Sequence, residues 1–182
     1  MPLNDYLAEH PPHPNPYSAN DIITLLRENH WLITTPTAEL LAWAERAAQL
    51  LGHYAEDRAA LANLLRPVFH YDAARILQSP DAQAAISRYA ARDVIRHLAL
   101  LLLEPAPFTS ERFKEVATCL KETCGVRSRD LFHPIRLSLT GRTGEGELDR
   151  VILLLDEASC LPFATPVKPV RTRILEFCSA LD

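Results

Sequence analysis

Glycine is so scarce in this chain that an all-β architecture would be difficult to build from it. The 182 residues include five glycines and 14 prolines, whereas alanine and leucine are abundant. Sheet sandwiches and barrels need many glycines in their turns, while alanine and leucine are strong helix formers. We therefore expect an all-α fold in which the prolines lie between helices or in their first turns.

The spacing of apolar and capping residues predicts a series of helices separated by short loops. The expected helices cover residues 20–32, 38–51, 56–65, 72–77, 80–103, 110–124, 130–139, 147–155 and a last stretch that begins near residue 169. Ser79-Pro80-Asp81 is the clearest start, because a capping serine precedes a proline and an acid in the first turn. Gly52, Gly125 and Gly141 are expected to end helices, and so is Pro67.

The same pattern divides the chain into four parts. Residues 10–16 contain four prolines, which favour an extended, polyproline-like segment, so residues 1–17 are expected to form an N-terminal arm. The link Glu104-Pro105-Ala106-Pro107 is the best candidate boundary between two helical subdomains. We expect a helical bundle over residues 18–104, a smaller helical subdomain over 105–163 and a C-terminal tail helix over 164–182.

The charge of the chain is unevenly distributed. The net charge is −4; residues 1–60 hold three basic and eight acidic side chains, and residues 61–182 hold 16 basic and 15 acidic ones. Nucleic-acid-binding domains are usually basic, so this balance argues against strong non-specific affinity for RNA. Any site for a polyanion is expected in the later two thirds.

Nothing in the sequence suggests secretion or insertion into a membrane. The N-terminus lacks the basic and apolar regions of a signal peptide, and the longest strongly apolar run covers only Leu98–Leu103. We expect a cytoplasmic protein with no membrane partner and with reduced thiols.

No motif predicts catalysis, a cofactor or a metal site. The segment Gly141–Gly146 has three glycines but lacks the preceding strand and the Lys-Ser/Thr pair of a phosphate-binding loop. His10 and His13 are interpreted as part of a solvated arm. Cys119 and Cys124 could bind a metal together with His133, but on one helix the two thiols would point about 140° apart. Small buried side chains are the favoured interpretation of both cysteines.

Two patterns within residues 80–103 leave alternatives open. Asp93 and His97 are spaced as an oriented acid–base pair, although a structural hydrogen bond or simple surface placement is favoured. Arg88, Arg92 and Arg96 recur every four residues and could meet phosphate. A solvated face paired with acidic residues is the favoured alternative for these arginines.

The most informative motif begins at Glu111. A helix opens at Phe113-Lys114-Glu115-Val116 and ends near Cys124–Arg127, and the string Leu131-Phe132-His133-Pro134-Ile135-Arg136-Leu137-Ser138-Leu139-Thr140-Gly141 follows. This resembles the last domain of bacterial glutamyl-tRNA synthetase, in which a helix ending at Gly-Val/Leu-Lys precedes Leu-Phe-x-Pro-Leu-Arg-x-Ala-Leu-Thr-Gly. The aromatic-rich segment Arg66–Asp72 is similar to the join between the family's two anticodon-binding subdomains. The resemblance covers about residues 60–160.

The resemblance implies an all-helical fold whose smaller subdomain reads the anticodon. In the family, the arginine of the Pro-Leu-Arg string and a leucine at the start of the next helix contact the anticodon, and these positions match Arg136 and Leu148. Arg127, Arg129 and Arg142 would complete the RNA-binding surface. Splayed anticodon bases can be recognised by guanidinium groups and by apolar contact.

Each of the two matched positions also has a structural interpretation. Arg136 could instead form a surface salt bridge to Asp130 or Asp149, and Leu148 taken alone would be a core residue. The two interpretations of Arg136 remain open at this stage.

The chain also departs from the family pattern. Glu145 stands where some members use a threonine to read the anticodon, and a carboxylate there would repel phosphate. The family's basic continuation is replaced by Asp156–Cys160. Lys168, Arg171 and Arg173 in the tail restore some basic character.

The catalytic half of the family has no counterpart. Neither a His-Ile-Gly-His-like nor a Lys-Met-Ser-Lys-Ser-like motif occurs, so we expect a chain that does not aminoacylate tRNA and is not itself an enzyme. It would be a free-standing duplicate or half of a split enzyme, and Met1 favours a separately made protein.

The leading functional prediction is a tRNA-binding or tRNA-related adaptor whose partner is the anticodon stem-loop. The alternative is an anticodon-binding fold reused for protein–protein interaction, with a partner such as a synthetase. The sequence defines no oligomeric state.

Overall fold

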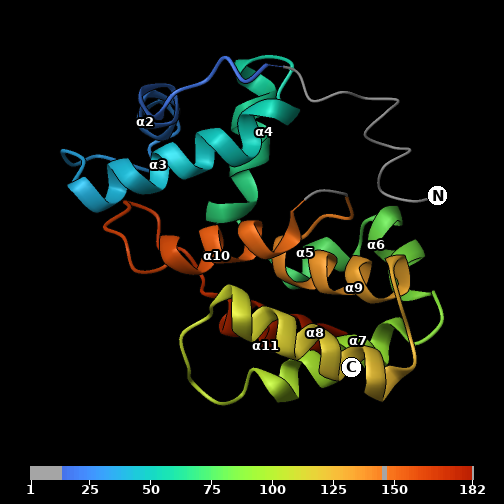
Figure 1. The fold of residues 1–182 in the computed structure, drawn as a ribbon. Coiled ribbons are helices and arrows are strands. Elements are labelled where there is room, and N and C mark those ends of the chain that lie inside the picture. Colours follow the sequence, from blue (N-terminus) through green and yellow to red (C-terminus); the bar gives the residue numbers. More distant parts are fainter. Residues whose placement is uncertain (1–13, 145–146, 182) are drawn as a thin grey trace. The chain divides into compact units, whose positions relative to one another are not determined.

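The computed structural model describes residues 14–144 and 147–181, and over these ranges it contains helices and no strand. The helices are α2 (Ala19–Glu28), α3 (Ala38–Leu51), the short 3-10 helix η1 (Gly52–Tyr54), α4 (Arg58–Phe69), α5 (Ala73–Leu77), α6 (Pro80–Ile86), α7 (Ala91–Leu101), α8 (Ser110–Cys124), α9 (Arg129–Thr140), α10 (Leu148–Ala158) and α11 (Val170–Leu181) (Figure 1). The expected all-α class is therefore confirmed.

Capping residues start the helices where the sequence indicates. The side-chain oxygens of Thr37, Asp72, Ser79 and Thr109 each accept a hydrogen bond from the backbone N–H three residues later. Each bond satisfies an N–H group that has no partner inside its own helix. Most helix starts are thus decided by local chemistry.

Two expectations about helix ends were wrong. Pro67 lies inside α4, which continues to Phe69. The expected helix over residues 80–103 is broken into α6 and α7, and Ala90 between them has a φ of 56°, in the left-handed region. An alanine seldom adopts this conformation, so nothing in the sequence predicted the break. As a consequence, Arg88 precedes the helix that carries Arg92 and Arg96.

The chain folds into two compact units. Among the described residues, the first consists of residues 14–66 and 161–166, and the second of residues 67–144, 147–160 and 167–181. The boundary expected at Glu104–Pro107 falls inside the second unit, where α7 and α8 on its two sides pack against each other. Residues 1–13, the greater part of the expected arm, lie outside the described ranges, as do His10 and His13.

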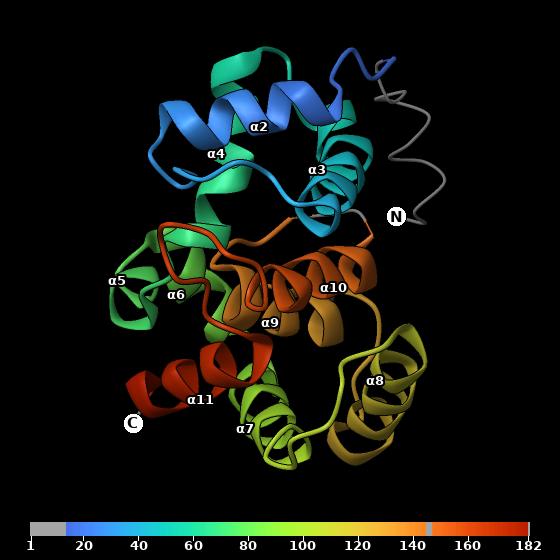
Figure 2. The same cartoon turned by 90° about the vertical axis from the view of Figure 1, so that its left-hand side faces the viewer.

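The first unit is built on the packing of α2 against α3 (Figure 2). Trp43 is fully buried, and its ring meets that of Phe163 edge to face with centroids 5.2 Å apart. The N–H of Ala164 donates to the carbonyl of Trp31 at 2.8 Å. The later segment, residues 161–166, therefore completes a core that the N-terminal helices begin.

The second unit has a core to which α7, α9 and α11 contribute most (Figure 1). Its most deeply buried apolar side chains are Ala82, Val94, Ile95, Leu120, Ile135, Ile152, Ile174 and Phe177. Each of α7, α9 and α11 packs against the other two, so α9 is held along its length by neighbours distant in sequence.

A fully buried arginine on α11 binds backbone carbonyls in the last turns of α4 and α9, all of which lie in the second unit. The guanidinium of Arg173 donates to the carbonyls of Pro67 at 2.9 Å, Val68 at 2.7 Å and Leu139 at 3.1 Å, and to that of Lys168 at 2.8 Å. Pro67 and Val68 lie in the last turn of α4, and Leu139 lies in the last turn of α9. Carbonyls in a last turn lack partners within their helix, and a cation there is favoured by the helix dipole. This contact explains why α4 continues past its proline.

Tyr71 covers the buried cation. Its ring centroid lies 4.7 Å from Cζ of Arg173, and its hydroxyl donates to the carbonyl of Ser138. Burial raises the pKa of Tyr71 and lowers the pKa of Arg173 to about 10. At neutral pH the tyrosine is therefore uncharged and the arginine is still a cation, which suits a guanidinium stacked on an aromatic ring.

Replacing the buried arginine should strongly destabilise the second unit. Arg173→Leu is expected to lower the free energy of unfolding by about 3–5 kcal/mol, because buried carbonyls lose their donors. Arg171→Leu is the matched control: Arg171 is exposed and donates to the carbonyl of Leu103, so its loss should cost less than about 1 kcal/mol. Urea denaturation followed by circular dichroism measures both values, and equal losses would contradict the role given to Arg173.

Gly52 ends α3 for a reason other than the expected one. Its φ is −61°, so no left-handed conformation requires a glycine. Instead, a Cβ at this position would lie 1.9 Å from Oδ1 of Asn15. The amide of Asn15 donates to the carbonyl of Ala48 at 2.9 Å and accepts from the N–H of Tyr17 at 3.0 Å. The missing side chain makes room for this contact.

A double-mutant cycle tests this close approach. Gly52→Ala alone should cost about 1–3 kcal/mol, because the methyl group overlaps the Asn15 amide. In an Asn15→Ala background the same change should be neutral or should stabilise by up to about 1 kcal/mol, since alanine readily adopts this φ. Chemical denaturation of the four proteins gives the coupling, and additive effects would show that the two residues do not interact.

Candidate nucleic-acid interface

The end of α9 is shaped by the Thr-Gly pair of the family-like string. Gly141 has a φ of 74° and donates to the carbonyl of Leu137 at 2.8 Å, which closes the helix. A Cβ on Gly141 would also lie 2.8 Å from Cδ1 of Ile76, so glycine is required here for two reasons. The hydroxyl of Thr140 donates to the carbonyl of Arg136 at 2.8 Å. The chain therefore turns at Gly141, one helical turn after Arg136.

The loop that follows α9 returns alongside Arg136. The N–H of Arg142 donates to the hydroxyl of Thr140 at 3.3 Å, and a Cβ on Gly144 would lie 3.9 Å from Cδ of Arg136. Arg136 is half-buried, whereas Arg142 is exposed. The structure thus places two of the predicted contact residues, Arg136 and Arg142, at one end of α9.

The outward face of α9 carries two arginines with an aromatic residue between them. Arg129, Phe132 and Arg136 are spaced three and four residues apart, which places them on one side of a helix. Arg129 is exposed and Phe132 is 40% exposed, whereas Leu131, Ile135 and other apolar residues of α9 are buried. We call the surface formed by Arg129, Phe132 and Arg136 the α9 face.

The predicted contact residues do not all meet at one point. Arg127 and Arg129 are exposed at the start of α9, whereas Arg136 and Arg142 lie toward its other end. A helix of 12 residues is about 18 Å long, so the two groups are well separated. Glu145 lies outside the described residues.

Leu148 occupies a core position. It is the first residue of α10, is 6% exposed and belongs to the hydrophobic core of the second unit. This is the structural interpretation that the sequence left open for it. So buried a side chain offers little surface to an RNA base.

The tail contributes less positive charge to the surface than the sequence suggests. Arg173 is fully buried, and Lys168 donates to Glu176 at 2.8 Å and to the carbonyl of Tyr71 at 3.1 Å. Only Arg171, among the three basic residues named in the tail, is exposed. The structural use of Arg173 could not be read from its local sequence, because its partners lie up to 106 residues away.

The structure does not support the acid–base pair or the metal site that the sequence left as alternatives. Nδ1 of His97 lies 2.8 Å from the backbone carbonyl of Asp93, which supports a structural hydrogen bond in place of an acid–base pair. Cys119 is exposed, contrary to the expectation of a buried side chain, and Cys124 is half-buried with its thiol pKa raised by burial. Within residues 14–144 and 147–181, no three His, Cys, Asp or Glu side chains are grouped to hold a metal ion.

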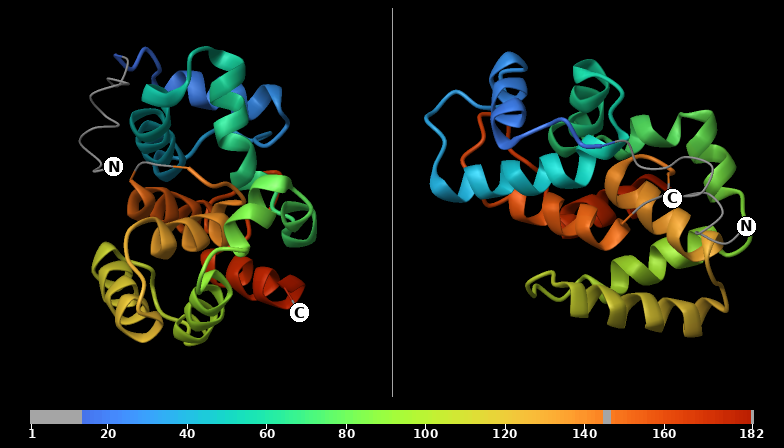
Figure 3. Two further views of the ribbon diagram at one scale, coloured as in Figure 1. Left: turned by 90° about the vertical axis from the view of Figure 1, so that its right-hand side faces the viewer. Right: turned by 45° about the horizontal axis from the view of Figure 1, so that its top comes forward.

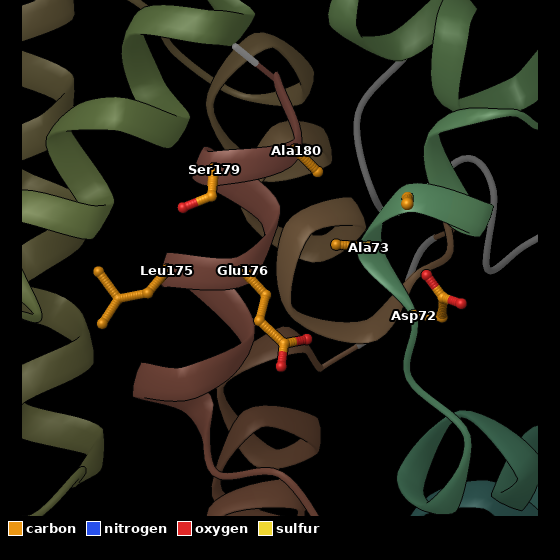
Figure 4. A pocket seen from close by; sticks show the side chains of 7 residues that line it. Asp72, Ala73, Leu175, Glu176, Ser179 and Ala180 are labelled. Carbon is orange, nitrogen blue, oxygen red and sulfur yellow. The ribbon is translucent and has the colours of Figure 1, made fainter.

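An acidic hollow of about 540 Å³ lies between α5 and α11 (Figure 4). Its polar lining includes Asp72 and Glu176, which come from opposite sides. Asp72 caps α5 by accepting from the N–H of Arg75, and Glu176 pairs with Lys168 at 2.8 Å. Both carboxylates therefore have structural roles, and their charge makes this hollow unsuitable for a polyanion.

Phe132 is the residue of the α9 face to which sequence reasoning assigned no contact. Its signal was its position: it is three residues after Arg129 and four before Arg136, on a helix whose other apolar residues have a different phase. A partly exposed aromatic ring between two arginines offers a surface on which an unpaired base can stack.

No helix in the described part of the chain is both long and apolar enough to cross a membrane.

Comparison with known proteins supports a relation to tRNA ligases over part of the chain. No family model matches. The chain is 40% identical over 80 residues to Glutamate--tRNA ligase 2 of Syntrophus aciditrophicus (strain SB), a match covering 43% of this chain and 16% of that protein. It is 36% identical over 64 residues to Glutamate--tRNA ligase 1 of Brucella ovis, covering 35% of this chain and 14% of that protein. The matched region thus spans less than a fifth of these relatives.

The difference in burial between Leu148 and Phe132 can be tested by measuring the free energy of unfolding of their alanine variants. Leu148→Ala is expected to lower the free energy of unfolding by about 2–4 kcal/mol, because it opens a cavity in the core. Phe132→Ala, on the partly exposed α9 face, should cost about 1 kcal/mol or less. Urea titrations of both variants provide the comparison, and a larger loss for Phe132→Ala would show that this side chain is a core residue.

Proposed function

We propose that the chain binds the anticodon stem-loop of a tRNA through the α9 face and acts as a tRNA-related adaptor without aminoacylating activity of its own. The observation that carries this proposal is the arrangement of Arg129, exposed Phe132 and Arg136 along one side of α9. The partial similarity to glutamate–tRNA ligases supports RNA as the ligand.

The chemistry of the α9 face suits an unpaired RNA loop. Unpaired bases stack on aromatic rings and on guanidinium planes, whereas bases inside a duplex are already stacked on their neighbours. Phe132 can supply a ring, and Arg136 and Arg129 supply guanidinium groups to bases or phosphates. We therefore assign base stacking to Phe132 and leave Leu148 out of the direct contact.

Two observations support the adaptor role within this proposal. Neither signature motif of the synthetase catalytic domain occurs among them. The relatives named as ligases are matched over at most 16% of their length. Ligase activity therefore belongs to those whole proteins, and tRNA binding is the part of their function that we propose for this chain.

A protein-interaction module is the second candidate function. The net charge of −4 favours it, because RNA binders are usually basic. Tyr89 and Leu100 are 80% and 62% exposed, and exposed apolar side chains are common where proteins meet. In this case the chain would bind a protein partner and be indifferent to RNA.

Binding of total tRNA tests the proposal directly. Wild-type affinity should fall steeply between about 50 and 200 mM salt, because phosphate contacts release counterions. Arg136→Ala and Phe132→Ala should each weaken binding by roughly tenfold, the latter because a stacked base is worth about 1–3 kcal/mol. Arg75→Ala changes an exposed arginine on α5 that is not one of the residues of the α9 face; this control should bind as the wild type does.

The outcomes separate the two candidate functions. Filter binding or fluorescence anisotropy gives the affinities, and thermal melts check that each variant is folded. Absence of tRNA binding by the wild type even at low salt would exclude the RNA proposal. Co-purification with a protein would then favour the interaction module.

A further inference from the structure

A second hollow of the molecule is lined by arginines. It has a volume of about 380 Å³ and lies where α6 gives way to α7. The connection from α6 to α7 lies in the green part of the ribbon in Figure 3. Its charged lining residues are Arg88, Arg92, Arg96 and Asp93. We call it the arginine hollow.

The break between α6 and α7 shapes the arginine hollow. Arg88 lies in the connection, before Ala90 with its left-handed φ of 56°. Arg92 and Arg96 lie one turn apart on α7. All three side chains nevertheless line the same depression. The three arginines therefore line one depression although the helix is broken between the first of them and the other two.

The excess of positive charge in the arginine hollow favours the binding of an anion. The lining carries three guanidinium groups and one carboxylate, that of Asp93, and Arg88 also pairs with Asp130 at 3.8 Å, so positive charge remains in excess among these groups. Arg92 uses one N–H group on the carbonyl of Leu181 at 3.2 Å, and a guanidinium carries five such groups. Guanidinium groups recognise phosphate oxygens particularly well, because their planar fork can make two parallel bonds.

The arginine hollow is continuous with the start of α9. Arg88 forms an ion pair with Asp130 at 3.8 Å, and Asp130 follows Arg129 directly on the chain. Both partners are about half exposed, so the pair does not close the hollow off. Arg127 and Arg129 lie near the start of α9, apart from Arg136. The arginines of the hollow are therefore their basic neighbours.

We infer that the arginine hollow, together with Arg127 and Arg129, binds the phosphate backbone of the RNA whose unpaired bases meet the α9 face. This inference rests on the proposed function and extends it. The α9 face provides base contacts, which select the RNA, and the arginine hollow provides phosphate contacts, which position it. Phosphate contacts carry no sequence information but make binding depend on salt.

The salt dependence of tRNA binding distinguishes the two kinds of contact. In Arg92→Gln/Arg96→Gln, which keeps the Arg88–Asp130 pair, the slope of log affinity against log salt should become shallower by about 1 to 2. The control, Arg27→Gln/Arg75→Gln, removes the same charge from exposed sites outside the hollow and should keep the wild-type slope. Phe132→Ala should weaken binding while also keeping that slope.

Each result has a separate meaning. A wild type that binds tRNA, with equal slopes for the hollow variant and its control, overturns the arginine hollow as a phosphate site and leaves the proposed function intact. A wild type that fails to bind tRNA at low salt overturns the proposed function and this inference together. A shallower slope in the hollow variant alone supports the inference.

Inorganic phosphate alone distinguishes RNA from a free anion as the ligand. We expect weak, non-saturating shifts of the amide resonances of residues 87–92 during an NMR titration, because a single phosphate lacks the neighbouring contacts of a backbone. Saturable binding of inorganic phosphate, combined with unchanged tRNA slopes in the hollow variant, would identify a free-anion site and overturn the assignment to RNA.

Discussion

The second unit depends on one buried cation, Arg173. Its guanidinium satisfies carbonyls at the ends of α4 and α9 while Tyr71 covers it. Burying a guanidinium away from water costs free energy unless its N–H groups donate hydrogen bonds. Here they donate to carbonyl groups that would also be costly to bury without a partner. Because Leu139 is one of these partners, the same contact holds the end of α9, where Arg136 and the Thr140-Gly141 turn lie.

Held in this way, α9 serves two purposes. Its buried side packs into the core, and its outward side presents Arg129, Phe132 and Arg136. The partial similarity to glutamate–tRNA ligases gives this surface an RNA interpretation, and the arginine hollow extends the basic surface from the start of the helix. The net negative charge of the chain does not conflict with the proposed RNA site, because at about 0.1 M salt screening limits the reach of distant carboxylates to about 10 Å.

The candidate site could be predicted only in part. Resemblance led to Arg136, and helical spacing alone would have led to Phe132, because both signals lie within one segment of the chain. The sequence predicted RNA contacts for Arg136 and also for Arg127, Arg129, Arg142 and Leu148. It could not show that α9 separates the first two from Arg142, and it left the choice between RNA contact and core packing open for Leu148, because both depend on how α9 and α10 are oriented against the core.

The sequence by itself determined the all-α class and most helix starts, because capping bonds and helix propensity act over three or four residues. It also determined the ends of α8 and α9, where Gly125 and Gly141 adopt left-handed conformations. Only the tertiary structure decided the continuation of α4 through Pro67, the break at Ala90, the division into two units and the burial of Arg173. Several of these features run against local preference, and the contacts that hold them join residues as much as 106 positions apart.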